Sequence, residues 1–245
     1  MVREFREKPY MHDLNAAILL AAQLIYTGDA DLLEIIGLSI GVSLTAVLAS
    51  CVIGMLLGAS VAVLKFRGRG AVTILLNSLM GLPPVVVGLG VYLLLSRAGP
   101  LGVFGLLYTP TAMIIAQTIL VMPIVAALTR QVVEDFYAEY DEQLRSLGVR
   151  GRRLVTTLLW DARYSLITVA LAGFGRAIAE VGAVMIVGGN IDHLTRVMTT
   201  AIALETSKGN LALALALGII LVGVSLLVNG AVASLGRRFG RSRYD

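Results

Sequence analysis

Long apolar runs, separated by short polar segments, make up most of the chain. A helix needs about 20 apolar residues to cross the ~30 Å hydrocarbon core of a membrane. We therefore expect five transmembrane helices, at residues 35–64, 72–95, 110–128, 165–187 and 211–235. A shorter apolar stretch, residues 16–26, predicts a helix lying in the membrane interface. The pattern predicts an all-α integral membrane protein, with an N-terminal interfacial segment (1–33) ahead of a transmembrane domain (34–245).

The second predicted span is interrupted by two consecutive prolines, Pro83 and Pro84. Each proline removes a backbone donor, so the helix has to bend or break near the middle of the membrane. Backbone groups freed at that depth are tolerated only against protein or a water-filled path. The break is therefore either part of a transport pathway or a structural kink.

The fourth predicted span carries Arg176 and Glu180, four residues apart on one face of a helix. Ionisable side chains inside a membrane need a partner or water. In one interpretation the two residues neutralise each other and hold the bundle together. In the other they line or gate an aqueous path, with Arg176 supplying positive potential to an anion.

Two glycine pairs with a spacing of four residues occur in the first predicted span, Gly37 with Gly41 and Gly54 with Gly58. Such pairs let a second helix approach closely. We interpret them as packing positions, and contact between two copies of the chain is a further interpretation.

Composition agrees with a membrane protein, because 57% of the residues are hydrophobic, 15% are charged and the mean hydropathy is +0.85. These values exclude an ordinary soluble domain. We expect no nucleic-acid site, since the cations lie beside apolar runs, as membrane topology requires. Cys51 is the single cysteine, which excludes an intrachain disulfide, and we expect no metal site.

The Lys and Arg residues predict the orientation in the membrane. With five spans, thirteen of the 20 Lys and Arg residues fall on one side and six on the other. Because positive residues favour the cytoplasm, we expect a cell-membrane protein with its C-terminus in the cytoplasm and its N-terminus outside.

Residues 141–161 are the longest polar interruption and fall on the cytoplasmic side of this topology. Leu144 and Leu147 would share one face of a helix. Gly148 can end that helix in the left-handed conformation, and a second helix would follow. We name this helix–turn–helix the basic hairpin (residues 141–161), after Arg150, Arg152 and Arg153. Its exposed basic and apolar groups suit docking to a soluble partner.

The segment between the fourth and fifth spans, residues 188–210, falls on the outer side. Residues 198–204 predict a short helix that cannot span a membrane. The segment suits either an outer lip that receives a substrate-delivery protein or a plain helical hairpin. His193 lies alone there, and we expect no switching role for it.

The basic hairpin resembles the cytoplasmic coupling loop of ABC importer permeases, whose pattern is Glu-Ala-Ala, three residues, Gly, nine residues, Ile-x-Leu-Pro. The resemblance implies a coupling loop at about residues 131–163. Glu142 and Gly148 match this pattern in identity and spacing. The positions that depart from it are Gln143, Leu144, Leu158, Trp160 and Asp161. The resemblance implies that the protein is coupled to an ATP-binding subunit through Glu142, Arg145, Leu147 and Gly148.

A second resemblance covers nearly the whole chain from about residue 11. Residues 180–183 (EVGA), 188–191 (GGNI) and 195–210 (TRVMTTAIALETSKGN) look like the permease subunit of tungstate uptake ABC transporters, a branch close to molybdate and sulfate permeases. This resemblance implies a type I ABC importer permease that forms a homodimer, with two ATP-binding subunits and an external oxyanion-binding protein as partners. The expected cargo is tungstate, with molybdate or sulfate as alternatives.

The chain has no Gly-x-x-x-x-Gly-Lys-Ser/Thr phosphate loop, so ATP would be used by a partner subunit and the chain would bind no cofactor itself. A secondary transporter or channel would also have broken helices and a buried charge pair, although such carriers usually hold both halves in one chain. We find no set of nucleophile and base or of metal ligands within the spans, as a membrane-embedded enzyme would need, because His12 and His193 both lie outside them.

Overall fold

The computed structural model describes residues 18–19, 22–23, 26 and 30–241, and its regular elements from residue 30 onward are all helical. They are α2 (Ala30–Val63), α3 (Arg69–Leu79), α4 (Pro84–Leu95), the 3₁₀ turn η1 (Gly102–Phe104), α5 (Pro110–Ser146), α6 (Arg152–Asp161), α7 (Arg163–Ile178), α8 (Gly182–Gly188), α9 (Met198–Ser207) and α10 (Leu211–Arg241). The all-α prediction is confirmed for this part of the chain. The interfacial segment predicted at residues 1–33 lies largely outside it.

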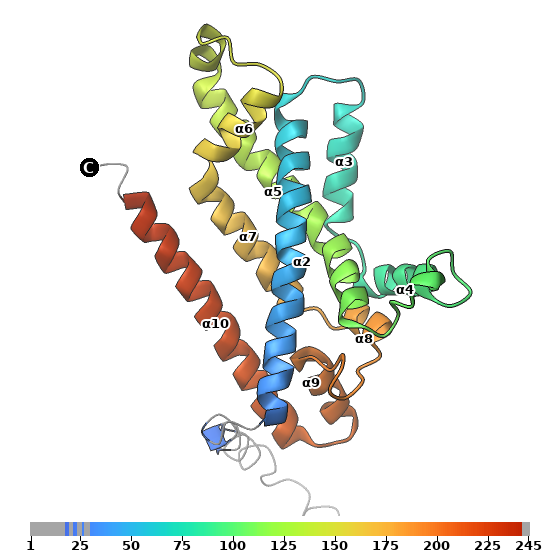
Figure 1. The fold of residues 1–245 in the computed structure, drawn as a ribbon. Helices are drawn as coiled ribbons and strands as arrows, with labels where there is room; N and C mark the ends of the chain where they lie inside the picture. Colours follow the sequence, from blue (N-terminus) through green and yellow to red (C-terminus); the bar gives the residue numbers. More distant parts are fainter. Residues whose placement is uncertain (1–17, 20–21, 24–25, 27–29, 242–245) are drawn as a thin grey trace, which may run out of the picture.

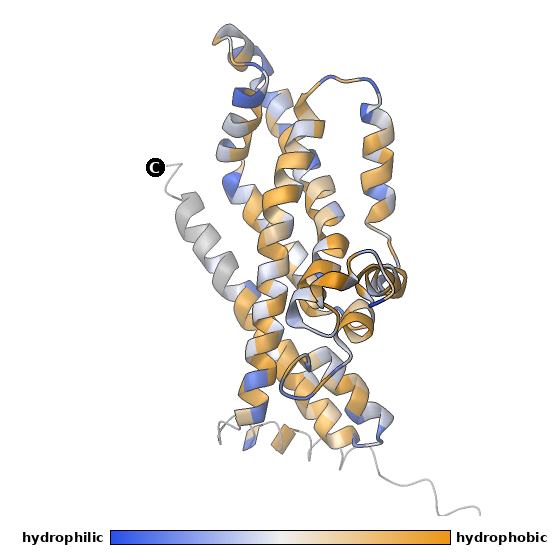
Figure 2. Ribbon diagram, turned by 45° about the vertical axis from the view of Figure 1, so that its right-hand side comes forward, coloured by the Kyte–Doolittle hydropathy of each residue, from blue (hydrophilic) through white to orange (hydrophobic). Residues whose placement is uncertain are grey.

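Three of the described helices are long and apolar enough to cross a membrane, namely Ala30–Val63, Pro110–Leu144 and Leu211–Gly230. Two bent pairs would raise the number to five if each counts as one span. In these pairs α3 meets α4 at 101° and α6 meets α7 at 80°. Apolar residues fill the middle of the bundle, and hydrophilic residues gather toward its two ends (Figure 2).

The centre of the bundle is the contact between α2 and α5, which run side by side (Figure 1). A Cβ atom added at Gly58 would lie 2.2 Å from the carbonyl oxygen of Ala126, and one added at Gly54 would lie 2.9 Å from that of Met122. The two backbones therefore touch at these glycines. Gly37 and Gly41 have nothing within 4 Å of such an atom, so only the second predicted glycine pair packs within the described chain.

Two predicted spans have different ends in the structure. The third continues past residue 128 as α5, which ends at Ser146, because the polar sequence there keeps helical spacing and buries Val133 and Leu144. Polar residues end an apolar run without ending a helix. The fourth span is not one helix, since α7 ends at Ile178 and α8 begins at Gly182.

An ion-pair network ties the turn between α2 and α3 to α5. The guanidinium of Arg69 donates to the carbonyl oxygen of Ala62 and to the carboxylate of Glu134, both at 2.8 Å. Arg130 donates to the other oxygen of Glu134 at 2.6 Å. The turn between α2 and α3 lies at the same end of the bundle as α6, whereas α9 lies at the opposite end (Figure 1).

We predict that Gly58→Ala destabilises the protein by about 1–3 kcal/mol, the range for overpacked cores, because a backbone carbonyl cannot move aside as a side chain could. Thermal unfolding in detergent, followed by circular dichroism, measures the effect. The matched control is Gly41→Ala in the same helix, where the added methyl meets open space. An equal melting temperature for the two variants would contradict the close contact.

Candidate functional site

The basic hairpin is built around two glycines with positive φ. Helix α5 ends at Ser146, and Gly148 follows with φ +67°. The Val149 N–H donates to the Leu144 carbonyl at 3.0 Å, the bond that closes a Schellman motif. Gly151, with φ +58°, precedes α6. The predicted helix–turn–helix is confirmed, and its turn requires conformations that side chains with a Cβ rarely adopt.

Helix α6 packs against the ends of α2 and α5 through Leu154, Val155 and Leu158. Leu144 joins this core, whereas 76% of Leu147 is exposed. The prediction that these two leucines share a helix face is wrong, because the helix ends at Ser146 and Leu147 lies beyond it. Leu147 instead offers an apolar group to a partner.

The four predicted coupling residues lie in one continuous stretch at the tip of the hairpin. Glu142 is exposed on the last turn of α5, which also contains Arg145, and the exposed Leu147 and Gly148 follow. Trp160, at the other end of the hairpin, is also exposed, with the Arg163 guanidinium 4.8 Å from its ring centroid. The coupling role of the four residues stays a prediction.

The predicted proline break is a sharp turn between α3 and α4. Pro83 is the N-cap of α4 and Pro84 its first residue, so the two missing donors fall where a helix does not need them. Helix α4 then runs crosswise to the long helices, at the side of the bundle, and packs on α8 (Figure 1). A Cβ added at Gly88 of α4 would lie 2.7 Å from the Cα of Ala183 in α8.

The second break, residues 179–181, contains Glu180 of the predicted charge pair, and Arg176 lies in the last turn of α7. Arg176 donates to Glu180 Oε2 at 2.6 Å, and the N–H of Ala183 donates to Glu180 Oε1 at 3.0 Å. Only 3% of the Glu180 side chain is exposed, compared with 32% for Arg176. The carboxylate therefore holds the last turn of α7 and the first turn of α8 together, although the two residues do not share one helix as predicted.

Neighbouring helices satisfy further backbone groups at this break. Gln117 of α5 donates through Nε2 to the carbonyl of Ala177 at 3.1 Å. The Thr199 hydroxyl of α9 donates to the backbone carbonyl of Glu180 at 2.9 Å. Because α4 packs on α8, the structure brings the proline break and the charge pair, the two pathway candidates, to neighbouring positions. Whether they line a path stays a prediction.

Helix α9 confirms the short helix predicted at residues 198–204, and α2 holds its start in place. The N–H of Met198 donates to the Ser39 hydroxyl of α2 at 2.8 Å. His193 is not alone, because its Nδ1 lies 2.8 Å from Glu34 Oε2 of α2. Sequence spacing could not reveal this pair, since 159 residues separate its members. Asp31, Glu34 and His193 place ligand atoms within 4.8 Å of one another and could hold a metal ion, although all three are exposed.

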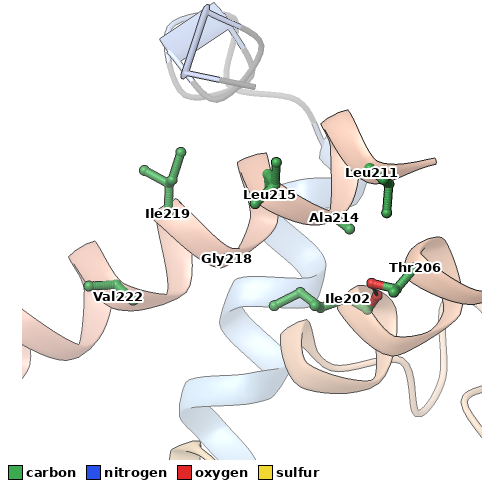
Figure 3. A pocket seen from close by; sticks show the side chains of 8 residues that line it. All are labelled: Ile202, Thr206, Leu211, Ala214, Leu215, Gly218, Ile219 and Val222. Carbon is green, nitrogen blue, oxygen red and sulfur yellow. Dashed lines mark hydrogen bonds between the residues drawn. The ribbon is translucent and has the colours of Figure 1, made fainter. Parts of the chain in front are cut away.

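A large apolar groove of about 690 Å³ lies between α9 and α10 (Figure 3). Its lining residues are Ile202, Thr206, Leu211, Ala214, Leu215, Gly218, Ile219 and Val222. Thr206 contributes the one polar side chain, so the groove lacks the donors that an oxyanion needs. Helix α10 is also the least covered of the three long apolar helices. Within an apolar segment of 18 residues, 22% of its residues are buried, compared with 50% for α2 and 56% for α5.

Residues 51–241 match the family described as the binding-protein-dependent transport system inner membrane component. The chain belongs to this family. Several relatives are similar to this chain over most of their own length. A probable anion ABC transporter permease protein of Haloferax volcanii is 41% identical over 213 residues, which cover 85% of this chain and 90% of the relative.

Two further comparisons bear on the substrate class. The tungstate uptake system permease protein TupB of Peptoclostridium acidaminophilum is 40% identical over 215 residues, covering 88% of this chain and 94% of the relative. The sulfate transport system permease protein CysT of Escherichia coli is 27% identical over 197 residues, which cover 78% of this chain and 71% of the relative. The resemblance to permeases of the tungstate uptake type is confirmed.

We predict that Glu180→Gln destabilises the protein by about 1.5–3 kcal/mol, the usual value for a hydrogen bond to a charged group. The amide keeps one acceptor but leaves Arg176 without its counter-charge. Chemical or thermal unfolding measures the loss. Asp192→Asn is the matched control, because Asp192 pairs with Arg196 at the same spacing of four residues but is itself 58% exposed. Equal losses would contradict a special role for the buried carboxylate.

We predict a pH-dependent contribution from His193. Its hydrogen bond to Glu34, together with the charges of Glu34 and Asp192, raises the pKa of the imidazole above the ordinary 6.5. The pair is therefore fully stabilising below pH 6.5 and loses its effect as pH rises through the raised pKa. His193→Gln should lower the melting temperature at about pH 5.5 and leave it unchanged at about pH 9. Glu34→Gln should behave alike, and a loss independent of pH would contradict the ion pair.

Proposed function

We propose that this chain is the permease subunit of an ATP-driven ABC importer that carries an oxyanion into the cytoplasm, with tungstate as the expected cargo and molybdate or sulfate as the alternatives. The proposal rests on the 40% identity to the permease TupB of Peptoclostridium acidaminophilum, which extends over 94% of that protein. A type I importer architecture, an ATP-binding partner and an external binding protein follow from the same relationship. The chain itself is a transport subunit and no enzyme.

The geometry of the basic hairpin supports coupling to an ATP-binding subunit. The hairpin joins α5 to α7 through α6, and its tip presents Glu142, Leu147 and Gly148 to solvent. At the far ends of the same two helices, Gln117 of α5 bonds to Ala177 of α7 beside the break. A partner that binds the hairpin therefore acts on both α5 and α7, the two helices joined beside the charge pair.

Two copies related by a two-fold axis would place the oxyanion path between them, since one chain offers three to five spans. Exposed apolar side chains along α4, among them Val86, Leu89 and Leu93, leave a surface for the second copy near both breaks. The hairpin end faces the cytoplasm in this proposal, and the end with α9 receives the external binding protein.

Cross-linking tests the proposal directly. In a Cys51→Ala background, Leu147→Cys should form a cross-link to the ATP-binding subunit produced in the same cells, because Leu147 lies at the hairpin tip. Thr206→Cys, at the opposite end of the protein, is the control and should not. Tungsten accumulation, measured by mass spectrometry with molybdate and sulfate as competitors, then reports the cargo. Uptake by the chain without any ATP-binding subunit would favour a secondary transporter or channel.

We predict that Gly148→Val uncouples ATP hydrolysis from uptake, reducing tungsten accumulation at least tenfold while the protein still inserts into the membrane. A β-branched residue is strained at φ +67°, so the hairpin tip has to change shape. Gly209→Val is the matched control, since Gly209 has φ +79° and equally open surroundings but lies between α9 and α10. Normal coupled uptake by Gly148→Val would contradict the coupling role.

A further inference from the structure

A small polar cavity lies beside the charge-pair break, where α2, α5 and the start of α9 meet. Six of the residues that line it are Ser39, Ser43, Gln117, Glu180, Met198 and Thr199. Its volume of about 10 Å³ is close to the ~10–15 Å³ that one water molecule requires. The cavity is separate from the apolar groove between α9 and α10.

The Gln117 side chain is the main indication that the cavity holds a ligand. It is 3% exposed, and its Nε2 group bonds to Ala177. Its Oε1 atom has no hydrogen-bond partner in the described part of the chain. A buried amide oxygen without a donor is costly, and native proteins satisfy most such atoms with protein groups or ordered water.

Ser43 supplies a second polar group to the same space. It lines the cavity and is 3% exposed, so its hydroxyl can bond to a small molecule held there. Ser39 and Thr199 already donate, to the carbonyls of Ile35 and Glu180. The cavity is therefore lined by one acceptor on α5 without a partner, Gln117 Oε1, and by the Ser43 hydroxyl on α2, around a space that fits one small molecule.

The cavity is too small for an oxyanion, and the Glu180 carboxylate in its wall would repel one. A bare cation would be repelled by the guanidinium of Arg176, which lies 2.6 Å from that carboxylate, and by the positive end of α9. A water molecule suits both Gln117 Oε1 and the Ser43 hydroxyl, because it can donate to an amide oxygen while it accepts from or donates to a hydroxyl.

We propose that this cavity binds one internal water molecule, which donates to Gln117 Oε1 and shares a hydrogen bond with the Ser43 hydroxyl. The water joins α2 to α5 next to the break and completes the polar network around Glu180. This site does not depend on the transport function proposed above, since it follows from burial and hydrogen bonding alone.

X-ray radiolytic footprinting of the purified full chain tests the proposal. Radiolysis of a bound water releases hydroxyl radicals that oxidise a neighbouring methionine to the sulfoxide, even where bulk solvent does not reach. Met198 lines the cavity and is fully buried. Met113 is also fully buried, but lies in the apolar core against Gly188. We expect Met198 to be oxidised at least tenfold faster than Met113.

The variant Ser43→Val fills the space with a methyl group and should bring the oxidation rate of Met198 down to that of Met113. If this variant does not fold, Gln117→Leu removes the amide acceptor and should have the same effect. Equal protection of the two methionines in the unmodified protein would overturn the proposal. So would a melting temperature that rises in the presence of one particular monovalent cation, since that result assigns the cavity to an ion.

Discussion

Every break in a membrane helix releases backbone donors and acceptors that lipid cannot satisfy, and this constraint shapes the half of the protein that contains α4, α8 and α9. The break at residues 179–181 is accommodated by Glu180, which binds Arg176 on one side and the N–H of Ala183 on the other. Gln117 and Thr199 reach the same break from α5 and α9. The buried carboxylate is thus required by the fold as well as by any role in transport.

The opposite end of the protein depends on backbone contact and on turns. Gly58 lets α2 touch α5, and the ion pairs of Glu134 with Arg69 and Arg130 tie the start of α3 to the same helix. Helix α6 then packs its apolar face against both long helices. The exposed hairpin tip is consequently supported by a packed apolar core, and Gly148 and Gly151, both with positive φ, set the direction of its turn.

Periodicity and hydropathy predicted the helical class, the break at Pro83 and Pro84, the hairpin with Gly148 and the short helix α9. They failed where a boundary depends on tertiary contact. The end of α7 at Ile178 could not be predicted, because two of the groups that stabilise the break, Gln117 and Thr199, come from α5 and α9. Likewise, the partner of His193 lies in α2, and no pattern along the chain connects the two.

Helix α5 has a mechanical property that follows from its length. Its 37 residues span about 55 Å, and the contact of Ala126 with Gly58 holds it at a point between its ends. From that contact the helix continues for about 30 Å to the hairpin and for about 14 Å back to Gln117. One continuous helix of about 44 Å therefore connects the hairpin to the break at residues 179–181. Pro123, close to the contact with Gly58, removes one backbone hydrogen bond from this helix.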